Sequence, residues 1–304
     1  ILDRSGKLIR SFKSGMDDLA AADSVRAEGL KAARADSLRK AGATVDTSAL
    51  TAWVENLQDQ TVNPPYPQRV PEDPRAPNKA GLNRFAWNMQ YPPARMFVGG
   101  MGISSDGPMA LAGTYWARIS VNGKSDSVRF TLVNDPRGTA DAAALRAQFD
   151  FQMKVRDTVS AGVTALLTVR NVRQQLDDAI AKLGASDAAK VKQASDPFRA
   201  HLNSIEKVLY ETRLRSDEDN LVYEPGLLER TSNLGAMASS MPARPTNQMV
   251  EVFSDFAPHI GQEITDLNNS LKNDLPKVNS ALKAAGAPEI KVSSVDVLKA
   301  VSKY

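Results

Sequence analysis

The sequence contains no cysteine and only two histidines, His201 and His259, in 304 residues. The absence of cysteine excludes disulfide bonds, thiol nucleophiles and thiolate metal ligands. Each histidine stands alone in a helical pattern, so both are interpreted as packed or surface residues of helices. We therefore expect no metal site and no cofactor.

The common catalytic fingerprints are also missing. The sequence has no Gly-x-Ser-x-Gly elbow, phosphate loop, dinucleotide fingerprint or His-Glu-x-x-His motif. Glycosidases need only two acids, and three acidic groups remain: Asp17-Asp18, Asp177-Asp178 and 217–219. The first two are interpreted as solvated helix faces, and the third as a helix-connecting loop that lacks the central Gly of a calcium loop. The sequence therefore predicts no catalytic residue, and the chain is not expected to be an enzyme.

The charges of the two signs nearly cancel, and long apolar runs are absent. The chain has 38 Lys and Arg against 35 Asp and Glu, a formal net charge of +3, so nucleic acid is not an expected partner. No window approaches the 18 or so consecutive apolar residues of a membrane span. With 42% apolar residues, a chain of this length favours two domains.

Apolar residues recur with a period of two in the first half of the chain, which predicts β-strands. A short hairpin is expected in residues 1–12 around Ser5-Gly6, and a strand over residues 82–89 with Phe85 and Trp87 on its inner face. Residues 113–133 predict a hairpin around Asn122-Gly123. Its alternating apolar residues are expected to face inward; they are Tyr115, Ala117, Ile119, Val121, Val128, Phe130 and Leu132.

These strands are interrupted by a segment of different character, residues 13–80. Helical spacing predicts one or two helices from Met16 to Lys40 and another from Thr47 to Gln58, with Asp46 or Thr47 as its N-cap. Six prolines between Pro64 and Pro77 predict an extended, polyproline-like coil. Residues 1–137 are thus expected to form a small antiparallel Ig-like β-sandwich, with strands in 1–12 and 81–135 and an inserted helical and Pro-rich part.

From residue 138 onward the pattern is helical. Apolar residues at steps of three and four predict a helix of some forty residues that stops near Gly184. A second helix is expected from a cap at Ser186 or Asp187 toward Arg215, and a third from Glu224-Pro225. A fourth is expected from Met249 toward Ala285. The sequence therefore predicts an α+β protein in which an up-and-down helical bundle over 138–304 follows the sandwich.

Aromatic and Met side chains gather in the predicted loops and the Pro-rich segment, where a small sandwich cannot bury all of them. Such side chains are typical of interface cores, so partner contacts are predicted at Trp53, Tyr66, Tyr91, Met96 and Phe97. Met101 and Met109 share the pattern. The alternative is that these residues cap the open ends of the sandwich.

Two stretches carry a family resemblance: GLNRFAWNMQYP from Gly81 and GPMALAGTYWARISVNGKSDSVRFTLVNDPR from Gly107. They resemble the Ig-like domain that follows the β-propeller in bacterial sortilin-like or sialidase-repeat (BNR) proteins. Gly81, Asn83 and Trp87 match the family's Gly-x-Asn-x-x-x-Trp strand, and Gly113 to Tyr115 match its Gly-Thr-Tyr hairpin. The helical tail is also similar, so the resemblance covers nearly the whole chain. The propeller's Ser-x-Asp-x-Gly-x-x-Trp boxes do not occur, so a glycosidase activity is not carried over to residues of this chain.

Separately, a stand-alone version of this C-terminal region resembles a periplasmic accessory subunit of bacterial photosynthetic reaction-centre and light-harvesting complexes. This resemblance implies a non-catalytic, periplasmic or extracytoplasmic subunit that braces a larger membrane-associated assembly. Its expected partners are protein subunits, with membrane-surface contact as a further possibility. Because the chain begins at Ile1 rather than Met, a signal sequence or a whole domain is expected to have preceded it.

Two other classes of function stay open on the sequence. One is the accessory or sugar-binding portion of a sialidase-repeat glycosidase-like protein, in which exposed Trp and Tyr would stack on sugar rings. The other is a solute- or lipid-binding bundle, which requires an apolar cavity that a sequence does not reveal.

Overall fold

The computed structural model describes residues 1–14, 31–32, 35, 38–39, 45–49, 51, 73–97, 100, 102–104, 106–214 and 217–292. These residues form a mixed helical and β structure, in agreement with the predicted α+β class. The chain divides into two units, which are described separately. The first comprises Ile1–Arg10 and Met89–Tyr304, and the second comprises Ser11–Asn88.

Helix α3 (Ala142–Ile180) is the longest element of the first unit. Its N-cap is Asp141, whose carboxylate accepts the Ala144 N–H at 2.6 Å. Apolar residues recur along one side of the helix, and Val159, Val163, Leu166 and Val169 are fully buried against α4, α5 and α6. The predicted forty-residue helix is therefore confirmed, and its burial explains why so long a helix is stable.

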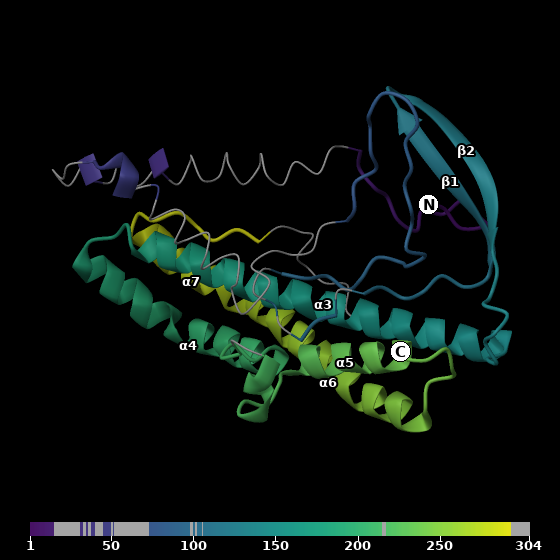
Figure 1. Cartoon of the computed structure of the whole chain (residues 1–304). Coiled ribbons are helices and arrows are strands. Elements are labelled where there is room, and N and C mark those ends of the chain that lie inside the picture. Colours follow the sequence, from purple (N-terminus) through teal and green to yellow (C-terminus); the bar gives the residue numbers. More distant parts are fainter. Residues whose placement is uncertain are drawn as a thin grey trace. The chain divides into compact units, whose positions relative to one another are not determined.

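Four further helices follow α3 (Figure 1): α4 (Ala185–Leu209), α5 (Leu227–Ser239), α6 (Asn247–Asn273) and α7 (Leu275–Ala284). A short 3-10 helix, η1 (Asp217–Leu221), lies between α4 and α5.

The ends of these helices differ from the prediction at three places. Helix α4 begins after Gly184 without a side-chain cap, so the predicted cap at Ser186 or Asp187 is wrong. The same helix ends at Leu209, six residues before Arg215, because Tyr210 adopts an extended backbone. The predicted fourth helix is divided at Asp274, since Pro276 has no N–H to continue the ladder of α6.

Side-chain pairs show the direction of α4 relative to α3. Arg170 pairs with Glu206, and Asp177 pairs with Arg199 farther along α3. Residue numbers rise along α3 while they fall along α4, so the two helices are antiparallel.

Helices α5 and α6 also pack on α3, and their directions differ. A Cβ atom at Gly162 would touch Leu228, and one at Gly235 would touch Val155, so α5 is antiparallel to α3. Phe253 packs on Phe151, and Ile260 lies close to Gly162, so α6 is parallel to α3. In the predicted up-and-down bundle of four helices, each helix runs opposite to the one before it. The structure differs, because α4 and α5 follow each other in the chain and both run antiparallel to α3.

The β structure of the first unit is a hairpin of β1 (Gly113–Val121) and β2 (Lys124–Leu132). Asn122 and Gly123 form the turn with positive φ angles of 48° and 76°, as the sequence predicts. Leu2 exchanges two backbone hydrogen bonds with Trp116, so the N-terminal segment pairs with the free side of β1.

The N-terminal residues also fold as predicted. Leu2 and Leu8 form an antiparallel bridge around the turn at Ser5-Gly6. The Asp3 carboxylate accepts the backbone N–H groups of Ser5 and Lys7, which stabilises this turn.

The predicted strand over residues 82–89 is wrong, because none of these residues belongs to a strand. The Asn83 amide bonds instead to the backbone of Lys79 and Gly81, which favours a local turn over a ladder. Gly81 and Met89 also have positive φ angles, which interrupt an extended run at both ends. In the described ranges the sheet is therefore two-stranded, and a sandwich is not seen.

The second unit is described only in parts. Asp46 accepts the N–H groups of Ser48 and Ala49, which confirms Asp46 as a helix N-cap. Phe12 and Phe85 pack with their ring centroids 4.7 Å apart. Most of the predicted helix over 16–40 and of the Pro-rich coil lies outside the described residues.

None of the helices in the described ranges has both the length and the apolar character that a bilayer span requires.

Two glycines in helices provide a matched test of the packing on α3. A Cβ at Gly162 would lie 2.3 Å from Leu228 Cδ2 and 3.2 Å from Ile260 Cγ2, whereas one at Gly261 of α6 would meet no atom within 4 Å. Alanine stabilises a helix by ~1 kcal/mol relative to glycine, and overpacking costs ~1–3 kcal/mol. We expect Gly261→Ala to raise the free energy of unfolding by ~1 kcal/mol and Gly162→Ala to lower it by up to ~2 kcal/mol in urea titrations. A change of the same sign in both variants would contradict this packing.

Candidate functional site

The segment that precedes the hairpin is tied to the helices by polar contacts. The backbone N–H of Arg95 donates to Ser160 Oγ at 3.0 Å, and its guanidinium donates to Thr164 Oγ1 at 2.8 Å. Ser160 and Thr164 lie one turn apart on α3. Farther along, the N–H of Ser104 donates to Ser232 Oγ of α5 at 2.9 Å. These contacts hold the segment against both helices.

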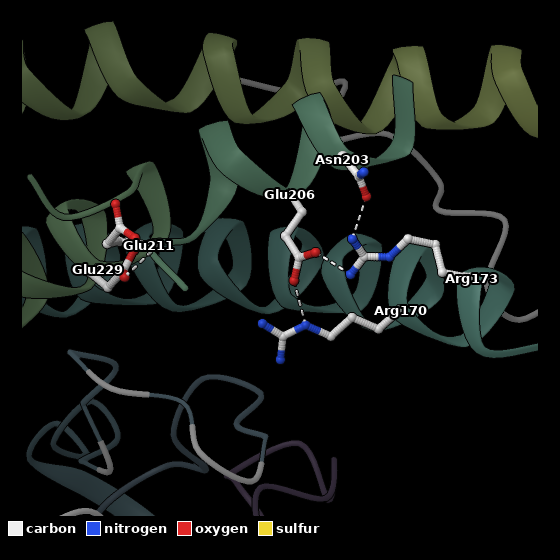
Figure 2. A network of polar contacts seen from close by, with 6 residues as sticks. All are labelled: Arg170, Arg173, Asn203, Glu206, Glu211 and Glu229. Atoms are coloured by element: carbon white, nitrogen blue, oxygen red, sulfur yellow. Dashed lines mark hydrogen bonds and ion pairs between the residues drawn. The ribbon is translucent and has the colours of Figure 1, made fainter. Parts of the chain in front are cut away.

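A buried ion-pair network joins α3 to α4 (Figure 2). Glu206 of α4 accepts hydrogen bonds from Arg170 Nε at 2.7 Å and from Arg173 Nη2. Arg173 also donates to Asn203 Oδ1 at 2.5 Å. Glu206 is buried, so the two guanidinium groups compensate a carboxylate that would otherwise be costly to remove from water.

Arg170 also connects this network to the loop that carries Phe97. Its guanidinium carbon lies 4.8 Å from the centroid of the Phe97 ring and 5.5 Å from that of Tyr210. The two rings pack edge to face, with centroids 5.1 Å apart. One cation therefore contacts a buried carboxylate and two aromatic rings at the same place.

A second acidic centre lies at the start of α5. Glu229 is 3% exposed; its Oε1 accepts the backbone N–H of Glu211 at 3.1 Å, and its Oε2 has no hydrogen-bond partner. Burial raises the pKa of Glu229 to about 7. Hydrogen bonds from Arg213 lower the pKa of Glu211 to about 2.

Two carboxyl groups with separated pKa values are a pattern of acid–base catalysis, but the geometry here differs from that of an active site. Glu229 contacts the backbone of Glu211 rather than its carboxylate, and Arg213 holds that carboxylate through two hydrogen bonds. Gly102 covers Glu229 so closely that a Cβ there would lie 2.9 Å from the Glu229 side chain. The arrangement fixes a loop on α5 and leaves the acid little access to solvent.

The predicted partner-contact residues fall in different places. Tyr91 packs its ring 5.0 Å from that of Phe149, and Met96 is partly buried against the core. Phe97 is buried beneath Arg170 and contacts the chain itself. Trp53 and Tyr66 lie outside the described residues. Contact of these five residues with a partner stays a prediction.

The outer half of the hairpin presents an apolar surface to solvent. Ile119, Val121 and Val128 are 66%, 59% and 64% exposed, although they were expected to face inward. The strand register places them on the same face, with Ala117 opposite Val128. We call these four residues the hairpin apolar face. It is uncovered in the described part of the chain because a two-stranded ribbon has no second sheet to pack on.

Four other candidate residues, Asp177, Asp178, His201 and His259, lie at the surface, while Asp17 and Asp18 lie outside the described residues. Asp177 pairs with Arg199, and Asp178 accepts a hydrogen bond from Gln174, both on exposed helix faces as predicted. His201 and His259 are also exposed on helices. Over the described ranges, no three or more His, Asp or Glu side chains come together as metal ligands do.

Sequence reasoning did not identify Glu206 and Glu229 as buried acids. Each is a charged residue at a helical position next to apolar ones, Ile205 and Leu228, and this signal is shared by many exposed acids. Their burial depends on which helix packs against them, and the sequence pattern does not show that.

Comparisons with protein families, with curated proteins and with solved structures found no match.

The raised pKa of Glu229 predicts a dependence of stability on pH. A carboxyl group ordinarily ionises near pH 4.5, and folding raises the pKa of Glu229 to about 7. The folded state therefore binds the proton more tightly, and its stability falls as pH rises from about 5 to 8, by at most ~3 kcal/mol from this group. We expect the free energy of unfolding of Glu229→Gln, measured by urea titration at about pH 5 and about pH 8, to fall less between the two pH values than that of the unchanged protein.

Glu251 of α6, which is exposed, supplies the control. Glu251→Gln should retain the pH dependence of the unchanged protein. A Glu229→Gln variant with the same pH dependence as that control would show that Glu229 is not a buried, protonated acid.

Proposed function

We propose that this chain is a non-catalytic structural subunit that braces a larger, membrane-associated assembly by binding its protein subunits. The observation that carries the proposal is the hairpin apolar face, which lies exposed at the outer half of β1 and β2. Burial of clustered aliphatic side chains is favourable because it removes apolar surface from water. A partner protein that covers this face would bury them.

The surroundings of the hairpin apolar face favour a protein partner. Lys124 and Asp126 lie on the same face, and Arg118 and Arg129 lie on the opposite one. An apolar centre with charges of both signs at its rim is typical of protein interfaces. In addition, within the described ranges β2 pairs only with β1, so its outer edge offers backbone groups to a partner strand.

The polar residues of the helices support a structural role. The ion pairs of Glu206 with Arg170 and Arg173 join α3 to α4, and the contacts of Arg95 and Ser104 hold the preceding loop on the bundle. Such contacts make a rigid support for a projecting hairpin. A rigid surface loses less entropy when it binds, which favours stable assembly.

The proposal extends to the fold and location that the resemblances imply. Residues 1–137 are proposed to be an Ig-like module, to which the Asn122-Gly123 hairpin contributes two strands. The chain is proposed to be periplasmic or extracytoplasmic and peripheral to a membrane, with a photosynthetic reaction-centre and light-harvesting complex as the proposed assembly. Direct contact with the membrane surface is a second mode of attachment.

Charged substitutions on the hairpin test the proposal. Ile119→Lys with Val128→Lys places two charges in the hairpin apolar face, and Ser125→Lys places one on the opposite face near the turn. All three side chains are exposed, so we expect unchanged melting temperatures. We expect the amount of the double variant that co-purifies with the native assembly to be at least tenfold lower than that of the unchanged chain. The reason is that burial of a charge in an interface core costs more than about 1.4 kcal/mol.

The control variant Ser125→Lys should co-purify at the level of the unchanged chain. Equal co-purification of the double variant and the control would sink the proposal, as would an unchanged chain that is always monomeric and free in native extracts. Binding of the free chain to lipid vesicles that the double variant loses would instead assign the hairpin apolar face to the membrane surface.

A further inference from the structure

The first unit contains a cavity of about 970 Å³ in addition to the surface described above. Its walls are Met89, Gln90 and Ala94, the loop residues Ser104 and 106–112, the end of the hairpin with residues 132–138, and facing surfaces of α3 and α5. This volume lies within the range of small-molecule binding sites, about 300–1,000 Å³.

The cavity exists because small residues of α5 face a wall that cannot move toward them. Ser232, Ala236 and Ser239 recur at steps of four and three, so one side of α5 carries no large side chain. These small side chains leave space toward the opposite loops, whereas Gly235 lies close to Val155 of α3.

The opposite wall is held by its own backbone hydrogen bonds. The N–H of Tyr91 donates to the carbonyl of Pro108 at 2.8 Å, and the N–H of Ala110 donates to the carbonyl of Met89 at 2.7 Å. A Cβ at Gly107 would lie 1.8 Å from the Tyr91 carbonyl oxygen, so only glycine allows these two loop segments to approach so closely. The wall is thus a fixed element rather than a loop free to fill the space.

The amide of Gln152, on α3, lines the cavity. The residue is 8% exposed, and its side chain makes no hydrogen bond to the described residues. One turn earlier, Gln148 uses its amide to cap α5 through the carbonyls of Ala238 and Met241. The amide atoms of Gln152 keep contact with solvent in the cavity, so a ligand that pairs with them would replace water as their hydrogen-bond partner.

A cation lies one turn beyond that amide. Arg156 also lines the cavity, and its side chain is 19% exposed. Its Nε and Nη2 atoms donate to Asp157, while Nη1 makes no hydrogen bond within the described ranges. Gln152 and Arg156 together therefore offer N–H donors to one acceptor group.

The other charges on the cavity wall do not oppose an anion at this position. Asp135 is neutralised by two hydrogen bonds from Arg137, and Asp106 is exposed to solvent. The remaining wall near Gln152 is apolar and includes Phe149, Val155 and Val159 of α3.

We propose that this cavity binds a long-chain carboxylate, with its carboxylate accepting hydrogen bonds from Gln152 and Arg156 and its alkyl chain along the apolar walls. Apolar walls with a few convergent polar groups are the common composition of such sites. The site is separate from the hairpin apolar face and does not depend on the structural role proposed above.

Calorimetric titration with dodecanoate, and with dodecan-1-ol as an uncharged counterpart, tests this site. The unchanged chain should bind one dodecanoate in a saturable manner. Arg156→Met should weaken dodecanoate about tenfold and leave dodecan-1-ol unchanged, since a charge-assisted hydrogen bond contributes ~1.5 kcal/mol. Gln152→Leu should also weaken dodecanoate, while the melting temperature of the free protein stays equal because the amide makes no hydrogen bond to the described residues.

Variants that fill the cavity distinguish binding of the ligand in the cavity from its adsorption at the protein surface. Ala236→Trp on α5 and Ala110→Phe on the opposite wall should each abolish binding of both compounds, and whichever variant retains its melting temperature decides the result. Ile119→Lys with Val128→Lys should leave binding unchanged. The proposal is overturned by an absence of saturable dodecanoate binding, by binding that survives in a folded cavity-filling variant, or by an Arg156→Met effect that is equal for the two compounds.

Discussion

The burial of helix α3 is the constraint on which the rest of the first unit depends. Its apolar side packs on α4, α5 and α6, and Gly162 lets Leu228 approach to a distance that a larger residue would prevent. Most of the stability of a helix in a protein comes from the packing of its apolar side, and α3 is packed in this way along most of its length. The hydrophobic contact along α3 thus sets the positions of the other helices.

Polar residues of α3 bind the loops that lie against the core. Ser160 and Thr164 bind Arg95, Arg170 contacts both Phe97 and Glu206, and Gln152 and Arg156 line the cavity. The loops before the hairpin are therefore placed by α3, and β1 continues from them. The helices thus support the hairpin, whose outer half is exposed.

Features that depend on neighbouring residues in the chain could be predicted from the sequence. The Asn122-Gly123 turn needs positive φ angles that these two residues adopt readily, and the helical spacing of α3 persists over ten turns. The apolar alternation of the hairpin was also found, but the side it faces was wrong for Ile119 and Val128. A period of two shows that one face differs from the other, and it does not show what covers it.

Features that depend on distant contacts could not be predicted. Residues 82–89 alternate like a strand, yet Asn83 bonds to its own turn and no partner strand competes with it in the described ranges. The direction of α5, the burial of Glu206 and Glu229, and the cavity beside Gln152 all follow from how helices meet. For the same reason, the partner-contact role predicted for Phe97 did not anticipate its buried position under Arg170.

Hydrogen–deuterium exchange tests most directly whether the exposed hairpin docks on a protein partner. Exchange would be compared between the free chain and the chain within its isolated native assembly. Amides of residues 117–128 should exchange at least tenfold more slowly in the assembly, while those of the buried centre of α3 should not change. Equal exchange of the hairpin in the two states would contradict the proposal that its apolar face is a docking surface.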